Sequence, residues 1–95
     1  MDKFLEYVNA NRDRFIAELQ DFCRQPSVAA QNLGMREMAD LVVARLQKLG
    51  AEARLIPVGD GAPVVYAEIG TGPRTLLIYD HYDVQPAEPL ELWES

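Results

Sequence analysis

The spacing of apolar residues predicts two helices in the first half of the chain. From Asp2 to Arg24 the apolar side chains recur at intervals of three and four, which is typical of one buried face of a helix. Asn9 and Asn11 interrupt this pattern, so the helix can break in its middle. A second stripe with the same spacing predicts a helix from Gly34 to Leu49, and Gly50 is placed to cap its C-terminus.

The apolar pattern changes period after the second helix and predicts three strands. Glu52–Ile56 and Val64–Ile69 have strand-like alternation or β-branched and aromatic content, and turn-forming glycines separate them. Thr75–Tyr79 is nearly all apolar, which predicts a strand buried on both faces, as in the centre of an α/β sheet. Two helices followed by three strands indicate the N-terminal part of an α/β sandwich. We expect that part to be incomplete, because no later element covers the third strand.

Three sulfur-containing side chains lie on the predicted apolar faces. Met35 and Met38 belong to the stripe of the second helix, and Cys23 belongs to that of the first. We expect all three to pack in the core, so Cys23 is interpreted as a packing residue rather than a nucleophile. A single cysteine cannot form a disulfide within the chain.

Composition narrows the classes of partner. The chain has 95 residues, with 9 Lys and Arg against 15 Asp and Glu, so its formal net charge is −6. No basic cluster is present to bind phosphates, which argues against nucleic acid and against anionic membranes as partners. The chain start lacks the basic and apolar regions of a signal peptide, and no apolar run could cross a bilayer, so we expect a cytoplasmic protein. The glutamates of the acidic tail, Glu88, Glu91 and Glu94, are interpreted as a solvated surface.

The candidate chemistry lies after the third predicted strand. His81, the single histidine, comes directly after it, where open α/β sheets place their ligands. Asp83 lies two residues on and points to the same side in an extended chain, so its carboxylate can reach the His81 ring or share a cation with it. Asp80 should face the opposite side. This spacing does not settle the function, because a zinc site needs three or four ligands and many histidines at strand ends only make hydrogen bonds.

A longer motif around His81 carries a family resemblance. The segment Leu76–Pro86 (Leu-Leu-Ile-Tyr-Asp-His-Tyr-Asp-Val-Gln-Pro), with Trp93 after it, resembles the first metal-binding motif of the M-twenty metallopeptidases. That family includes aminoacylases, carnosinase-type dipeptidases, succinyl-diaminopimelate desuccinylase and glutamate carboxypeptidases. Upstream, Phe15–Phe22 and Met38–Gly50 are similar to the first two helices of the family, and Pro26–Val28 is similar to its Pro-Ser-Val loop. The resemblance therefore covers nearly the whole chain in order.

The resemblance implies a zinc-peptidase-like α/β sandwich and a hydrolase with two zinc ions, for which cobalt or manganese could substitute. Such an enzyme cleaves the amide bonds of dipeptides or N-acyl amino acids with metal-activated water, and a glutamate serves as general base. His81 would be a metal ligand, and Asp83 would be the catalytic carboxylate that orients it. The full-length enzyme could be a homodimer. The Val84–Pro86 end of the motif is more similar to the dipeptidase branch of the family.

Two features depart from the family pattern. Asp80 stands where the family usually has glycine, so its side chain is expected to crowd the metal loop or to add negative charge beside it. The family's bridging aspartate, base glutamate, second histidine and lid or dimerisation domain are all absent from residues 1–95. We therefore expect residues 1–95 to be the N-terminal portion of a metallopeptidase catalytic domain, inactive by itself.

Two other functions remain open at this point. The chain could be a non-catalytic acidic interaction module, or a truncated relic, that retains the motif. It could also be a metal-independent His-Asp hydrolase, whose activity would survive chelation. In each case the third predicted strand would leave an apolar face and an unpaired edge, so we expect the isolated chain to associate.

Overall fold

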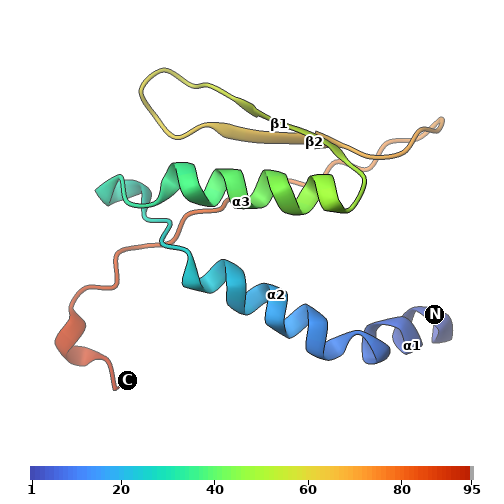
Figure 1. Ribbon diagram of the computed structural model, residues 1–95, viewed down its shortest axis with the longest axis horizontal. Helices are drawn as coiled ribbons and strands as arrows, with labels where there is room; N and C mark the ends of the chain where they lie inside the picture. Colours follow the sequence, from blue (N-terminus) through green and yellow to red (C-terminus); the bar gives the residue numbers. More distant parts are fainter. Residues whose placement is uncertain (95) are drawn as a thin grey trace.

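The computed structural model describes residues 1–94, which form three helices, two short 3-10 turns and one two-stranded sheet. This arrangement confirms the predicted α/β class (Figure 1). In chain order the elements are α1 (Asp2–Ala10), α2 (Arg12–Arg24), η1 (Ala29–Gln31), α3 (Met35–Lys48), β1 (Glu52–Ile56), β2 (Val64–Glu68) and η2 (Leu90–Leu92).

The first predicted helix is divided at Asn11. This residue leaves helical geometry, with φ −109° and ψ 12°, and its side-chain amide donates to the carbonyl of Tyr7 at 2.9 Å. Asparagine side chains compete in this way with the backbone hydrogen bonds of a helix. The break therefore lies where the sequence pattern allowed one, between α1 and α2.

Helix α3 and the β-hairpin form the ordered layer of the molecule. Strands β1 and β2 pair antiparallel, from Glu52 opposite Glu68 to Ile56 opposite Val64, and α3 lies along one face of the hairpin (Figure 1). The buried apolar residues gather at the start of α3 and in the loop before it. They are Val28, Met35, Met38 and Ala39.

The rest of the molecule is open. Its accessible surface is 8495 Å², whereas a compact monomer of this size exposes about 5,500 Å². Its radius of gyration is 16.3 Å, against about 12 Å for a compact chain of the same length. Figure 1 shows the reason: α1 and α2 extend away from the layer of α3 and the hairpin. The hydrophobic core is therefore thin.

An ion-pair network connects α2 to α3. The guanidinium of Arg45 contacts Asp21 at 3.0 Å and Glu18 at 3.5 Å, and it lies 5.6 Å from the ring centroid of Phe22. These side chains are partly exposed, so each pair contributes well under 1 kcal/mol.

The third predicted strand does not form. Thr75–Tyr79 has no strand partner among residues 1–94, and the side chains of Leu76 to Tyr79 are between 81 and 89% exposed. The apolar run shows that the segment has side chains suited to burial. A strand also needs a neighbouring strand whose backbone groups are free to pair with it. Thr75–Tyr79 pairs with neither strand of the hairpin, so the prediction of a buried strand is wrong for this structure.

The predicted core is confirmed for two of its three sulfur-containing residues. Met35 and Met38 are buried, whereas Cys23 is exposed, so its prediction as a buried residue is wrong. The apolar stripe of α2 predicts which side of the helix could be buried, but in this structure no part of the described chain covers Cys23. In the described chain no helix combines the length and hydropathy that crossing a membrane requires.

Candidate functional site

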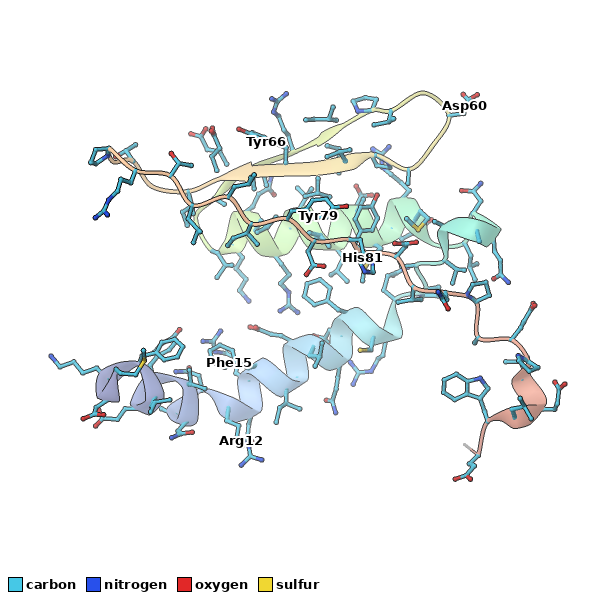
Figure 2. The ribbon with its side chains drawn as sticks, turned by 180° about the vertical axis from the view of Figure 1, so that it is seen from behind. Arg12, Phe15, Asp60, Tyr66, Tyr79 and His81 are labelled. Atoms are coloured by element: carbon cyan, nitrogen blue, oxygen red, sulfur yellow. The ribbon has the colours of Figure 1, made fainter. Side chains whose placement is uncertain are left out.

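The segment that carries the candidate site runs through the molecule as extended chain without regular secondary structure. Figure 2 shows Tyr79 and His81 on this segment, in the view from behind. After His81 the chain passes the loop that joins α2 to α3 and is hydrogen-bonded to Ser27 in that loop. The position of the candidate residues is therefore set by this loop, and not by the end of a strand as the sequence predicted.

The ring of His81 faces Asp83. Its Nδ1 atom lies 3.1 Å from the carboxylate Oδ1 of Asp83 and 2.9 Å from the backbone carbonyl oxygen of the same residue. Both partners can only accept a hydrogen bond, so Nδ1 carries the ring proton in this arrangement and donates it. The other ring nitrogen, Nε2, then keeps its lone pair. The His81 side chain is 71% exposed, which leaves that nitrogen open to a ligand.

The side chain of Asp80 turns to the backbone. Its Oδ1 atom accepts a hydrogen bond from the backbone N–H of His81 at 2.8 Å. The bond engages one carboxylate oxygen of Asp80, the residue that was expected to crowd the metal loop. It also leaves a negative charge one residue from the imidazole.

Ser27 holds the backbone on both sides of Asp83. Its hydroxyl donates to the carbonyl of Tyr82 at 2.5 Å, and its own carbonyl accepts the N–H of Val84 at 2.8 Å. With 2% exposure, Ser27 is the one buried polar residue among residues 1–94. The sequence places Ser27 in a family-like loop but indicates no function for it, and only the three-dimensional contacts reveal its connection to the motif.

The loop that contains Ser27 is itself closely fitted. Gly34 has a φ of +69°, and a Cβ atom at that position would lie 2.0 Å from the carbonyl oxygen of Pro26. Only glycine can adopt this conformation at such close approach. A bridge between Val28 and Leu33 closes the loop further. Ser27 therefore contacts the motif from a constrained position.

Tyr82 connects the motif to the hairpin. Its hydroxyl donates to the carbonyl of Pro63, just before β2. Burial of the phenol raises the pKa of Tyr82, and the negative charge of Asp83 raises it further. The hydroxyl therefore stays protonated, and able to donate, beyond the usual range of a tyrosine.

The ionisable residues that the structure describes do not complete a metal centre. Nowhere in residues 1–94 do three or more His, Cys, Asp or Glu side chains come together as a metal-binding group. The motif presents one imidazole nitrogen, oriented by one carboxylate. Two surface hollows of about 340 and 390 Å³ lie elsewhere, beside the hairpin and between α2 and α3, and neither is lined by His81 or Asp83.

Of the comparisons with known proteins, the one with curated proteins indicates a family. No family model matches the chain, and no solved structure matches it significantly. Curated relatives do match. The Cys-Gly metallodipeptidase of Schizosaccharomyces pombe is 36% identical over the whole of this chain and 23% of that enzyme. The human Beta-Ala-His dipeptidase is 28% identical over 98% of this chain and 22% of that enzyme.

A third relative extends the range of named activities. The succinyl-diaminopimelate desuccinylase of Xylella fastidiosa is 32% identical over 79% of this chain and 19% of that enzyme. The chain thus spans about a fifth of the length of the curated relatives it matches. These hydrolases share the family that the motif around His81 resembles. The chain is thus similar, over its whole length, to members of the M-twenty metallopeptidase family.

Proposed function

We propose that residues 1–95 are the N-terminal portion of the catalytic domain of a two-zinc hydrolase that cleaves amide bonds in dipeptides or N-acyl amino acids. The observation that carries this proposal is the His81–Asp83 pair, in which Nδ1 faces two acceptors and Nε2 remains free. Dipeptides are the favoured substrate class, because the Val84–Pro86 variant leans that way and two of the matching relatives are named dipeptidases.

The chemistry of the donor atoms fits a metal-bound histidine. Zinc accepts a neutral imidazole nitrogen, and a carboxylate on the other ring nitrogen fixes the tautomer and raises the basicity of the ring. We assign Nε2 of His81 as the metal-holding atom and Asp83 as the residue that keeps the proton on Nδ1. When bound, zinc would supply Lewis acidity towards water and the amide carbonyl.

One imidazole and its orienting carboxylate cannot hold two metal ions. A zinc site needs three or four ligands, and the motif offers one. We therefore propose that the remaining ligands and the general base come from chain beyond residue 95, and that residues 1–95 alone do not hydrolyse amides. The large exposed surface of the described residues is consistent with a portion of a larger domain.

The test uses the longest protein that the gene encodes, with zinc added. Hydrolysis of Cys-Gly and of β-Ala-His is measured together with bound metal, before and after chelation. We expect activity that chelation abolishes and zinc restores. His81→Ala should remove metal and about 99% of the activity or more, since it deletes a zinc ligand. Asp83→Asn should weaken metal binding about 10- to 100-fold.

The matched control is Glu88→Gln, which removes one negative charge from the exposed acidic tail. It should retain both metal and activity. Activity that persists after complete chelation would contradict the metal-dependent proposal and favour the metal-independent His-Asp hydrolase. Full activity of His81→Ala would also overturn the proposal.

The departure at Asp80 is tested in the same protein. Asp80→Gly removes the bond to the His81 N–H and the charge beside the ring. If Asp80 impairs the metal loop, this variant binds zinc more tightly and turns over faster. Equal affinity and equal rate would show that the aspartate is accommodated without cost.

A second function is favoured by one observation, the exposed apolar run from Leu76 to Tyr79. On an acidic chain, such a run suits a non-catalytic interaction module that has retained the motif as a relic. The two functions differ in the sequence expected after residue 95. A reading frame that encodes a further aspartate and a Glu-Glu pair supports the enzyme, and unrelated sequence or a stop supports the module.

A further inference from the structure

We propose that Ser27 is a positioning residue for the His81–Asp83 pair, acting through the two peptide groups that flank Asp83. This inference rests on the proposed hydrolase function, but the contacts behind it involve no metal. Ser27 lies 55 positions before Tyr82 in the sequence, so the link is made only by the fold.

The first contact that supports this role is with the backbone around Asp83. The carbonyl of Tyr82 belongs to the peptide group before Asp83, and the N–H of Val84 belongs to the peptide group after it. Ser27 bonds to both, through its hydroxyl and its carbonyl. Holding both peptide planes restricts φ and ψ of Asp83 together, which no single hydrogen bond would do.

The second contact leads from Asp83 to the imidazole. Nδ1 of His81 contacts two atoms of Asp83, the backbone carbonyl oxygen at 2.9 Å and the carboxylate Oδ1 at 3.1 Å. The direction of that carbonyl is set by the peptide plane that Ser27 holds through Val84. Ser27 thereby fixes the acceptors that choose the ring tautomer and leave Nε2 free.

Ser27 is also shielded from water. The residue is 2% exposed, and its hydroxyl also lies 3.5 Å from the sulfur of the buried Met35. Buried polar groups are normally hydrogen-bonded within the protein. The bond from the Ser27 hydroxyl to the Tyr82 carbonyl is therefore shielded from competing water. The exposed His81 ring therefore takes its orientation from a protected residue.

The test reads the ring tautomer in metal-free protein. The chain, taken as far as the gene encodes it, is labelled with ¹⁵N-histidine, and the His81 signals are assigned by their loss in His81→Gln. In the wild type we expect the proton on Nδ1. Ser27→Ala should shift the tautomer ratio towards that of the urea-unfolded protein, and Ser27→Thr, which keeps the hydroxyl, should restore it. A Ser27→Ala variant with the wild-type ratio would overturn the proposal.

Met38→Ala is the control for general destabilisation. It removes a buried side chain that has no hydrogen bond to the motif, so it should lower stability without changing the tautomer ratio. An equal shift in Met38→Ala would assign the effect to stability and overturn the positioning role. A further test uses the wild type alone. The Val84 amide should exchange its hydrogen slowly with solvent, because it donates to the Ser27 carbonyl. Exchange at the rate of an unstructured peptide would contradict that hydrogen bond.

A metal arm separates this inference from the proposed function. Competition with a chelating dye should show zinc affinity about tenfold lower in Ser27→Ala, with recovery in Ser27→Thr. If the tautomer depends on Ser27 but no zinc is retained, the positioning holds and the hydrolase proposal fails. If zinc and hydrolysis are present but neither affinity nor tautomer responds to Ser27, the hydrolase proposal holds and the positioning fails.

Discussion

Two segments without regular strands or long helices differ in how their side chains are buried. The loop from Pro26 to Gly34 mixes polar and apolar residues, and it contains the buried Ser27 and Val28 and closes through the bridge from Val28 to Leu33. The segment Thr75–Tyr79 is nearly all apolar, yet its side chains are among the most exposed in the molecule. Hydropathy alone therefore ranks these two segments in the wrong order.

The difference lies in the partners that each segment finds. The loop packs against the start of α3 and bonds to the motif after His81, so its buried hydroxyl, that of Ser27, has a partner within the fold. Thr75–Tyr79 has side chains and backbone groups that suit a sheet, but it pairs with neither β1 nor β2. Whether a segment is buried depends on the partners that the fold places beside it. Its composition determines only which kinds of contact it can make.

The largest expected effect tests how rigid the loop is. Gly34→Ala places a Cβ atom 2.0 Å from the carbonyl oxygen of Pro26 at a φ of +69°, so the backbone must shift. The conformation alone costs about 1–2 kcal/mol, and with the overlap we expect a loss of about 3 kcal/mol or more, or failure to fold. Urea unfolding followed by circular dichroism measures the loss.

Gly70→Ala is the matched control for this prediction. Gly70 also has a positive φ, +78°, but no atom lies within 4 Å of the added Cβ. It should lose only about 1 kcal/mol. Equal losses at the two glycines would show that the loop is not closely fitted.

The second effect compares a core side chain with the exposed segment. Met38→Ala empties part of the thin core and should cost about 2 kcal/mol of unfolding free energy. Leu77→Ala shortens a side chain that is 86% exposed and should change stability by less than about 0.5 kcal/mol. A large loss at Leu77 in the same urea titration would mean that the segment is buried in solution, by association or by pairing.

The third effect concerns the contact between the motif and the hairpin. Tyr82→Phe removes the hydrogen bond to Pro63 and should cost about 1 kcal/mol at neutral pH. The raised pKa of Tyr82 also gives a pH dependence. Below the unfolded value of about 10 both states keep the proton; above it the unfolded state loses its proton first, so stability falls as the pH rises towards the folded pKa.

Stability measured from about pH 8 to about pH 11.5 checks this sign. Tyr82→Phe should flatten the alkaline decline but not remove it, because the pKa of Tyr66 is also raised, chiefly by its hydrogen bond with Glu68. An unaltered slope in Tyr82→Phe would contradict the assigned shift.

The smallest effect concerns the partly exposed contacts between α2 and α3. Arg45→Met keeps the aliphatic stem but removes the ion pairs with Glu18 and Asp21, and it should cost about 0.5 kcal/mol. Because the other ion pairs are present in both proteins, salt at about 1 M should lower the stability of the wild type by more than that of the variant. A loss of several kcal/mol would show that α2 docks on α3 through these pairs.

The sequence predicted the elements whose apolar pattern is satisfied locally. Helix α3 and the two hairpin strands lie within one or two residues of their predicted bounds, because helix stripes and hairpin turns depend on neighbouring residues. The break at Asn11 was also allowed by the pattern. Thr75–Tyr79 and Cys23 were predicted wrongly, because their burial depends on partners that composition does not reveal.

The candidate site divides in the same way. That Asp83 can reach His81 is a consequence of their spacing of two residues, and the structure shows the two side chains in contact. The function of that pair stays a prediction. The bonds from Ser27 could not be read from the sequence, because they join positions 55 residues apart.

That separation has a consequence for the order of folding. The contact of Ser27 with Tyr82 closes a loop that contains α3 and the whole hairpin. Closing a long loop costs chain entropy, which the helix and hairpin must first offset by forming their own contacts. On the ribosome the chain emerges from its N-terminus, so Ser27 waits in an unfinished loop until residues 82–84 arrive. The imidazole therefore gains its fixed orientation only after α3 and the hairpin have been made, and until then a nascent chain meets cations with that ring still free to turn.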